Sequence, residues 1–267
     1  MLNYNFTKGV QMPNLIIHQI PVLKDNFVYL LHDSESGESV AIDPAVATPV
    51  LDVLELKGWT LSHIWNTHHH NDHTGGNLEL KQATGCSIVG SAADASRIPG
   101  IDVQIVEGDL ISIGSHTAQI FEVSGHTIGH IAYWLENDHI LFSGDTLFSS
   151  GCGRLFEGTP EQMWTSLLKL RNLPDDTNVY CAHEYTATNV NFALTIEPNN
   201  VALKRRLNEV LHLRKNGKPT VPSNLGDEKR FNPFLRADNV DLLRAIGLVG
   251  KDAVSVFAEI RRRKDEF

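Results

Sequence analysis

Short runs of apolar and β-branched residues, separated by turns, occupy the first two thirds of the chain. Such runs are typical of β-strands, and we predict strands at residues 15–20, 27–31, 39–42, 63–66, 87–89, 118–123, 131–135, 140–143 and 179–182. Apolar residues at helical spacing predict helices between them, at about residues 48–58, 76–84 and 160–171. This many strands of similar length indicate at least two sheets.

The helix predicted at 160–171 has a clear start signal. Thr159 stands at the N-cap and Pro160 at the first helical position, and Gln162 is placed to close a capping box. Apolar residues such as Trp164 and Leu167 then mark the side of the helix that faces the core.

After His183 the strand patterns give way to helical ones. We predict helices at about residues 186–195, 199–215 and 249–264, with a turn-rich, proline-bearing stretch at 217–233. We therefore place a domain boundary near residue 185, between a domain at 12–185 and a helical domain at 186–267. Residues 1–11 are expected to be a flexible extension, or an artefact of the chosen start codon, without a function.

The composition narrows the classes of protein that the chain can belong to. A net charge of −9 argues against broad nucleic-acid binding, which needs a basic surface. No segment approaches the roughly 20 apolar residues of a membrane span, and the N-terminus has no run like a signal peptide's. Cys86, Cys152 and Cys181 are an odd, scattered set without disulfide-framework spacing. We expect a cytoplasmic protein without membrane contacts.

The strongest chemical signal is the segment from Thr67 to Gly76, which contains an H-x-H-x-D-H pattern after a predicted strand. His68 and His70 are two residues apart, so in extended backbone their imidazoles leave the same side, while His69 points away. Asp72 and His73 follow where the chain turns into a helix, and can reach a second metal. The alternative is a polar loop with fortuitous histidines, but burying these groups without a partner is costly.

Three further candidates stand just after predicted strands: His126, Asp145 and His183. The full set divides into one group of three histidines, one mixed group and a bridging carboxylate, Asp145. We predict that the groups bind one metal each, the first through His68, His70 and His126, the second through Asp72, His73 and His183. Nitrogen and oxygen ligands without thiolate suit zinc, iron or manganese.

Two other polar residues stand close to these motifs. Asp43 and His130 either hold ligands in orientation or cap local backbone, and the sequence leaves both interpretations open. For Cys152 and Cys181 no activating base is specified, so we expect both thiols to be packing residues.

These motifs, in this order, resemble the metallo-β-lactamase superfamily. The chain is most similar to its glyoxalase II (hydroxyacylglutathione hydrolase) branch, through segments that other branches lack, at residues 151–159, 181–186, 232–236 and 261–267. The resemblance implies an α/β fold, an αββα sandwich of two mixed sheets with outer helices, and a helical glutathione-binding domain. It also implies two divalent metal ions, most simply zinc.

By the same resemblance, Arg154, Tyr185, Arg261 and Lys264 bind the glutathione portion, whose two carboxylates need cations. From composition alone the basic residues of the last helix would be cations that complement its dipole. Two positions depart from the family: Arg154 stands where Lys is usual, and Phe156 where Tyr is usual. Phe156 cannot supply a hydroxyl, so we expect binding in the same place without a hydrogen bond from this side chain.

The implied activity is hydrolysis of S-D-lactoylglutathione and related acyl-glutathiones, the second step of methylglyoxal detoxification. Asp145 would bridge the metals, and Asp72 would also accept a proton. The alternatives are a persulfide dioxygenase or lactonase of the same fold, and a binding module that has lost its metals. A small-molecule substrate and a monomer are expected.

Overall fold

The computed structural model describes residues 14–267, so the extension predicted at residues 1–11 lies outside the described residues. Two six-stranded mixed sheets form its centre. The first sheet has its strands in chain order: β1 (Leu15–Val22), β2 (Asn26–Asp33), β3 (Glu38–Ile42), β4 (Thr60–Trp65), β5 (Ser87–Ser91) and β6 (Val103–Ile105). The second has the spatial order β14 (Ser223–Asn224), β13 (Asn178–Cys181), β10 (Ile140–Gly144), β9 (Ile131–Leu135), β8 (His116–Glu122) and β7 (Leu110–Ile113).

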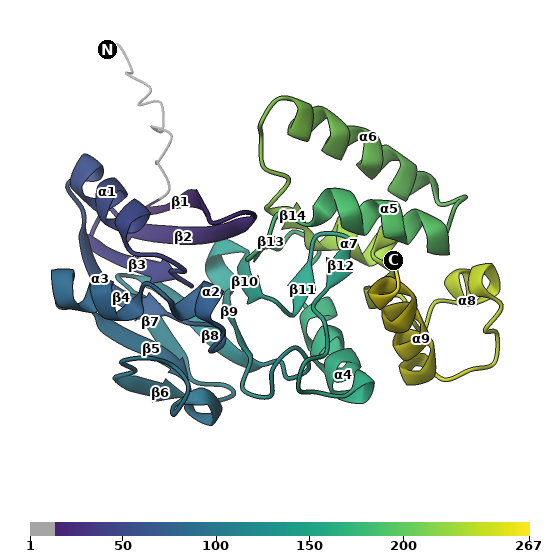
Figure 1. The fold of residues 1–267 in the computed structure, drawn as a ribbon, viewed down its shortest axis with the longest axis horizontal. Coiled ribbons are helices and arrows are strands. Elements are labelled where there is room, and N and C mark those ends of the chain that lie inside the picture. Colours follow the sequence, from purple (N-terminus) through teal and green to yellow (C-terminus); the bar gives the residue numbers. More distant parts are fainter. Residues whose placement is uncertain (1–13) are drawn as a thin grey trace, which may run out of the picture.

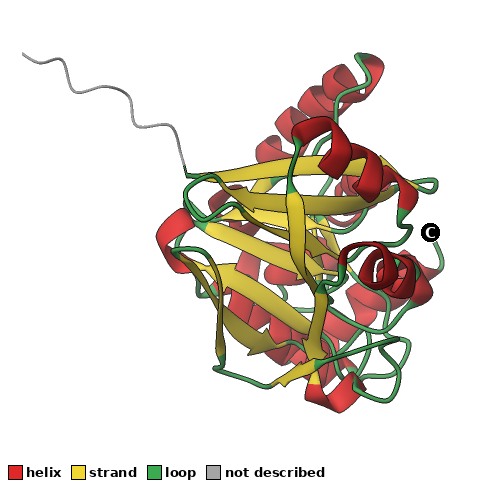
Figure 2. Cartoon of the chain, turned by 90° about the vertical axis from the view of Figure 1, so that its left-hand side faces the viewer, coloured by secondary structure: helices red, strands yellow, loops and turns green. Residues whose placement is uncertain are grey.

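Helices cover the outer faces of both sheets (Figures 1 and 2). Against the first sheet lie α1 (Thr48–Lys57) and α3 (Asn77–Thr84), and beside the second lie α4 (Pro160–Arg171), α5 (Thr186–Ile196), α6 (Val201–Lys215), α7 (Leu225–Phe231), α8 (Val240–Ile246) and α9 (Ala253–Asp265). Short elements complete the fold: α2 (Asn71–Thr74), the hairpin β11 (Leu147–Phe148) and β12 (Gly151–Cys152), and the 3₁₀ turns η1 (Ala92–Asp94), η2 (Glu136–Asp138) and η3 (Pro233–Leu235). In the described part of the chain, no helix is long and apolar enough to cross a membrane.

The αββα sandwich is held by a core between the sheets. Tyr29 and Trp65 of the first sheet are buried there with Tyr133 and Phe142 of the second. Burying each such side chain contributes about 1.5–3 kcal/mol. Separate apolar clusters join each sheet to its outer helices. The fold expected from the resemblance is therefore confirmed.

The strand directions bring several chain segments to one edge of the sandwich. β3, β4 and β5 are parallel, so their carboxyl ends lie together. In the second sheet β10 and β13 are parallel, and β8 runs the same way because both β8 and β10 are antiparallel to β9. A hydrogen bond from the Ile131 amide to the Thr67 carbonyl (2.9 Å) joins the two sheets at this edge. Every candidate metal ligand follows one of these strand ends.

Several elements differ from the sequence prediction. Neither the short edge strands β6 and β7 nor the helix α8 was predicted, and α7 lies inside the stretch expected to be turn-rich. The buried residues of α7 are Leu225, Gly226, Glu228 and Phe231, so a charged residue stands where an apolar one would mark a helix. Each of the two strands buries a single residue, which gives no alternating pattern.

Thr159 provides a test of the fold's local energetics. Its hydroxyl accepts the Gln162 amide (3.2 Å), and the Gln162 side chain accepts the Thr159 amide (2.8 Å), so the predicted capping box is present. We predict that Thr159→Ala lowers the free energy of unfolding by about 1 kcal/mol, measured by chemical denaturation. Thr159→Ser should retain most of the wild-type stability, and equal losses in both variants would contradict a capping role.

Candidate metal centre

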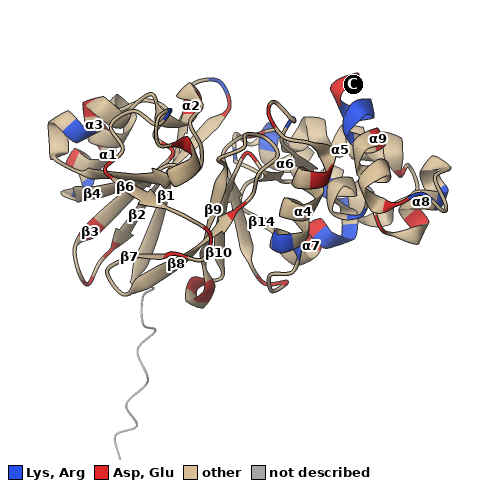
Figure 3. Cartoon of the chain, turned by 90° about the horizontal axis from the view of Figure 1, so that it is seen from below, with Lys and Arg blue, Asp and Glu red and all other residues tan. Residues whose placement is uncertain are grey.

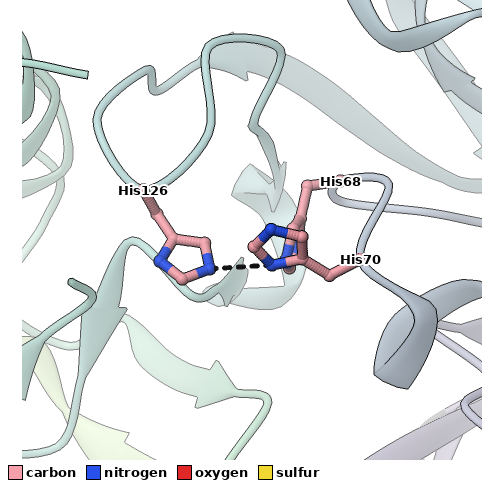
Figure 4. A group of neighbouring side chains, drawn as sticks. All are labelled: His68, His70 and His126. Atoms are coloured by element: carbon pink, nitrogen blue, oxygen red, sulfur yellow. Dashed lines mark hydrogen bonds between the residues drawn. The ribbon is translucent and has the colours of Figure 1, made fainter. Parts of the chain in front are cut away.

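Three imidazoles converge at the edge of the sandwich. His68 and His70 follow β4, and His126 lies in the loop after β8 (Figure 4). His70 Nδ1 lies 3.0 Å from His68 Nε2 and 3.1 Å from His126 Nε2. Ligand atoms bound at about 2.0–2.1 Å around a tetrahedral ion lie roughly 3.3 Å apart. The three nitrogens therefore have nearly the spacing of ligands to one metal ion.

A second group lies beside the first. Asp72 and His73 come from the short helix α2, and His183 follows β13. Asp72 Oδ2 lies 3.5 Å from His73 Nε2 and 3.6 Å from His183 Nε2. One ligand atom from each of these three residues falls within 4.8 Å of the others. The loop after β4 thus contributes to both groups, as its sequence predicted.

Asp145 lies between the two groups. Its Oδ1 is 3.3 Å from His183 Nε2 and 3.6 Å from His73 Nε2, while its Oδ2 is 3.4 Å from His126 Nε2. Within residues 14–267, Asp145 Oδ1 and His73 Nε2 are buried without a hydrogen-bond partner. Buried polar atoms are normally paired. Two such atoms facing each other across a cluster of nitrogen and oxygen donors fit a bound divalent metal.

The other ring nitrogens of His68 and His73 are held by a buried network. Asp43 accepts hydrogen bonds from the Thr67 amide and hydroxyl (both 2.7 Å) and from His73 Nδ1 (3.0 Å). The Thr67 oxygen accepts in turn from His68 Nδ1 (3.1 Å). Both histidines therefore carry a hydrogen on Nδ1 and present Nε2 to the centre as the nitrogen that a metal would bind. A third group of candidate ligands, Asp43, His68 and His73, is explained by these bonds.

His126 and His183 are fixed in the same way. His126 Nδ1 donates to the Arg154 carbonyl (2.9 Å), and His183 Nδ1 donates to the Asp25 carboxylate (3.1 Å). An oxygen that can only accept decides the tautomer in each case. Both rings are thus prepared for metal binding through Nε2.

The backbone at Asp145 is positioned by a glycine and a histidine. Gly144 has φ +50°, and a Cβ there would lie 2.5 Å from Thr67 Oγ1 and 2.7 Å from His130 Cε1. His130 Nε2 accepts the Asp145 amide (3.0 Å), which uses its lone pair. The sequence left open whether Asp43 and His130 orient ligands or cap local backbone. In the structure, His130 bonds to the backbone of the candidate ligand Asp145, and Asp43 bonds to the ring of the candidate ligand His73.

His69 points away from the centre, as predicted. Its Nδ1 bonds to Asp94 (2.9 Å), which is fully buried and pairs with Arg97. Arg97 also pairs with Glu157, which follows Phe156 in the loop over the first group. Phe156 itself is 63% exposed, with its ring 5.1 Å from that of His126.

Three residues with contacts at the site were missed by sequence reasoning. Asp25 bonds to His183, Asn26 to Asp72 and Asp94 to His69. Asp25 and Asn26 read as an ordinary turn before a strand, and Asp94 as a surface residue. Each acts across 25 or more residues, so no local pattern could have indicated it.

A cleft of about 1400 Å³ connects the two groups to the C-terminal helices. The predicted glutathione contacts Arg154, Tyr185, Arg261 and Lys264 all line it. Figure 3 shows Lys and Arg at the end of α9, where the last two lie. The Tyr185 ring stacks on His183 at a centroid distance of 4.6 Å, so this side chain joins the basic end of the cleft to the second group.

The cations at this end differ in their surroundings. Arg154 is exposed and 3.8 Å from Asp265. Arg261 is 5% exposed and donates to the Cys152 carbonyl (3.1 Å) and to Asp265 (2.8 Å). Lys264 Nζ lies 5.1 Å and 5.0 Å from the centroids of two phenylalanine rings, Phe192 and Phe267. Partial burial, together with Arg261, lowers the pKa of Lys264 to about 8.

Burial and charge shift the pKa values of the centre in opposite directions. Burial disfavours the charged form of His73, but the Asp145 and Asp43 carboxylates outweigh it and raise its pKa to about 9. Burial likewise opposes ionisation of Asp145, yet His183 and His73 hold its pKa well below the usual range. Burial, with the neighbouring imidazoles adding to it, lowers the pKa of His68. Without metals, protonated histidines of the second group therefore compensate the negative charge of the carboxylates.

The thiols near the site are packing residues. Burial raises the pKa of Cys152 to about 11 and that of Cys181 to about 12, and both are free cysteines. A thiol with so high a pKa is a poor nucleophile at neutral pH. This agrees with the interpretation made from the sequence.

Comparisons with known proteins identify the class. A family model described as the metallo-beta-lactamase superfamily matches residues 24–183, and the chain belongs to this superfamily. A second model, described as the hydroxyacylglutathione hydrolase C-terminus, matches residues 184–267. Together with the relatives described next, it places the chain in the hydroxyacylglutathione hydrolase family. The domain boundary near residue 185 remains a prediction.

The relatives are similar over nearly their whole length. A hydroxyacylglutathione hydrolase of Methylococcus capsulatus is 58% identical over 253 residues, covering 95% of this chain and 99% of the relative. One of Rhodospirillum rubrum is 58% identical over 256 residues, covering 96% and 100%. Among solved structures, ETHE1 from Myxococcus xanthus aligns with a TM-score of 0.65 at 25% identity, covering 94% of this chain and 100% of that one.

The raised pKa of His73 predicts proton release on metal binding. At pH 7 His73 is protonated in the metal-free protein because its pKa is about 9, and a metal must displace that proton. We predict release of at least one proton per chain at pH 7, and an affinity that rises toward pH 9. Isothermal titration calorimetry in buffers of different ionisation enthalpy measures this. Binding without proton release at pH 7 would contradict the assignment.

Proposed function

We propose that this chain hydrolyses the thioester of S-D-lactoylglutathione and related S-2-hydroxyacylglutathiones, releasing a hydroxy acid and glutathione. The observation that carries the proposal is a single cleft, lined both by members of the two candidate ligand groups and by the cations Arg154, Arg261 and Lys264. The family to which the chain belongs supports it, because relatives at 58% identity have the name of this activity.

The donor set fits two divalent metal ions. His68, His70 and His126 would hold one, and Asp72, His73 and His183 the other, with Asp145 between them. We propose zinc, with iron or manganese as alternatives, since all three accept nitrogen and oxygen donors. Such ions, when bound, supply a water of lowered pKa and polarise a carbonyl.

The carboxylates have distinct roles in hydrolysis. Asp145 is 6% exposed and faces both groups, so its carboxylate links the two ligand groups. The Asp72 side chain is 42% exposed and stands at the open side of the cleft. It accepts the proton that water loses as its oxygen bonds to the thioester carbon.

The leaving group needs little help. As the carbon–sulfur bond breaks, the electron pair leaves with sulfur, and glutathione departs as a thiolate. A thiol of ordinary pKa, about 8.5, gives a stable anion near neutral pH. A strong general acid is therefore not required.

The basic end of the cleft binds the glutathione portion. Arg154 and Lys264 offer cations to its carboxylates, and Tyr185 packs between this end and the metal centre. Arg261 is partly engaged by Cys152 and Asp265, so it orders this wall of the cleft as well as adding charge. We further propose that the protein is a monomer and that it acts in the cytoplasm, the latter in line with its three free, buried cysteines.

The proposal is tested by following loss of thioester absorbance with S-D-lactoylglutathione. We predict that Asp145→Ala, or treatment with a chelator, lowers kcat/KM at least about 100-fold, since metal-ion catalysis supplies several kcal/mol. Asp176→Ala removes an exposed carboxylate away from the cleft and serves as a control. A folded, metal-loaded protein that is inert toward glutathione thioesters would instead direct the search to persulfide or lactone substrates.

A separate pH dependence is expected from Lys264. Its pKa is lowered to about 8, so its positive charge is present below pH 8 and is lost as the pH rises through that value. We predict that KM for glutathione thioesters rises above about pH 8, and that kcat does not change in parallel with KM. In Lys264→Arg the guanidinium stays charged, so the rise in KM should disappear. A rise that persists in this variant would exclude Lys264 as its source.

A further inference from the structure

The turn between β1 and β2 contacts the second ligand group through two adjacent side chains. Asp25 accepts from His183 Nδ1 at 3.1 Å. Asn26 Nδ2 donates to the Asp72 side chain through Oδ2 and to the Asp72 backbone carbonyl, both at 3.1 Å. Oδ2 is also the Asp72 atom that faces His73 and His183. Two of the three ligands in this group are therefore oriented from one turn.

The first ligand group has no such dependence on the turn. His68 is held by Thr67, which is fully buried, and His126 by a backbone carbonyl. Among the candidate ligands, Asp25 and Asn26 bond only to members of the second group. The turn therefore supports ligands of the second group alone, although Asp43 supports one ligand in each group and Asp145 faces both.

Backbone bonds fix the turn against the His183 segment. The Glu184 amide donates to the Asp25 carbonyl and the Phe27 amide to the Ala182 carbonyl, both at 2.8 Å. These bonds involve no side-chain atoms, so side-chain substitutions at Asp25 and Asn26 leave them in place. The orientation of the ligands can therefore be changed without removing the turn.

We propose that Asp25 and Asn26 are positioning residues that set the affinity of the second group for its metal, independently of the first. The inference rests on the proposed two-metal site. The Asp25 carboxylate holds His183 in the tautomer that offers Nε2 and increases its basicity, and Asn26 directs Asp72 Oδ2 into the group. Loss of either interaction leaves a chain that binds its first metal normally and its second weakly.

The test compares metal affinities in Asp25→Asn, which keeps the side chain's shape, and Asn26→Ala. Lys24→Ala is the matched control, because Lys24 lies in the same turn and is exposed. Each purified full-length protein is stripped of metal and titrated with Zn²⁺ against a chromophoric chelator, which resolves the two dissociation constants. Co²⁺ absorption spectra at one and two equivalents report which ligand set is filled.

We expect the second dissociation constant to rise about 10- to 100-fold in Asp25→Asn and Asn26→Ala. The first constant and the one-equivalent Co²⁺ spectrum should stay unchanged, and Lys24→Ala should match the wild type. Equal weakening of both sites, or no change in either, would overturn the inference. If the wild type itself binds fewer than two metals, the two-metal site of the proposed function fails instead.

A folding defect is separated by a second measurement. Because metal-free proteins are compared, thermal unfolding of each metal-free variant reports on the turn alone. A variant with an unchanged melting temperature and a weakened second site supports positioning. If Asn26→Ala unfolds at a lower temperature while Asp25→Asn binds both metals as the wild type does, the side chains have only a structural role and the inference is wrong.

Discussion

The carboxylate of Asp145 is almost completely buried between the histidines of two ligand groups. A charge in such a place is strongly unfavourable unless positive charge surrounds it. In the metal-free chain protonated histidines supply that charge, and their pKa values rise accordingly. Divalent metals supply it without protons. The same electrostatic requirement favours metal binding and predicts that this binding depends on pH.

This requirement is met only because the sandwich brings to one edge the ends of the strands that precede the candidate ligands, β4, β8, β10 and β13. Each imidazole has only one nitrogen to offer, so its other nitrogen must be held by an acceptor from elsewhere in the fold. For His73 that acceptor is Asp43, and for His183 it is Asp25. The hydrogen-bonded acceptors determine the tautomers before a metal arrives, which reduces the reorganisation that binding requires.

The C-terminal helices are tied to the same edge by a buried polar network. Glu228 of α7 accepts the Ser150 amide (2.7 Å) and the Asn232 side chain (3.0 Å). The Asn232 side-chain Nδ2 also donates to the Phe148 and Gly151 carbonyls. This network holds the segment that leads from Asp145 to Arg154. The candidate metal centre and the basic part of the cleft are therefore supported by the same buried network.

The sequence by itself determined most of the strands and the capping box at Thr159, because these follow from local periodicity and residue type. The sandwich was expected from the resemblance of the motifs to a known superfamily, and the grouping of the candidate ligands, read from residue types at strand ends, stays a prediction. The sequence did not indicate α7, whose buried face includes the charged Glu228, or the contacts of Asp25 with His183. Those depend on segments far apart in the chain that meet only after the sheets pack. Residue chemistry is local and can be read along the chain, whereas the partner of a buried polar group is decided by tertiary structure.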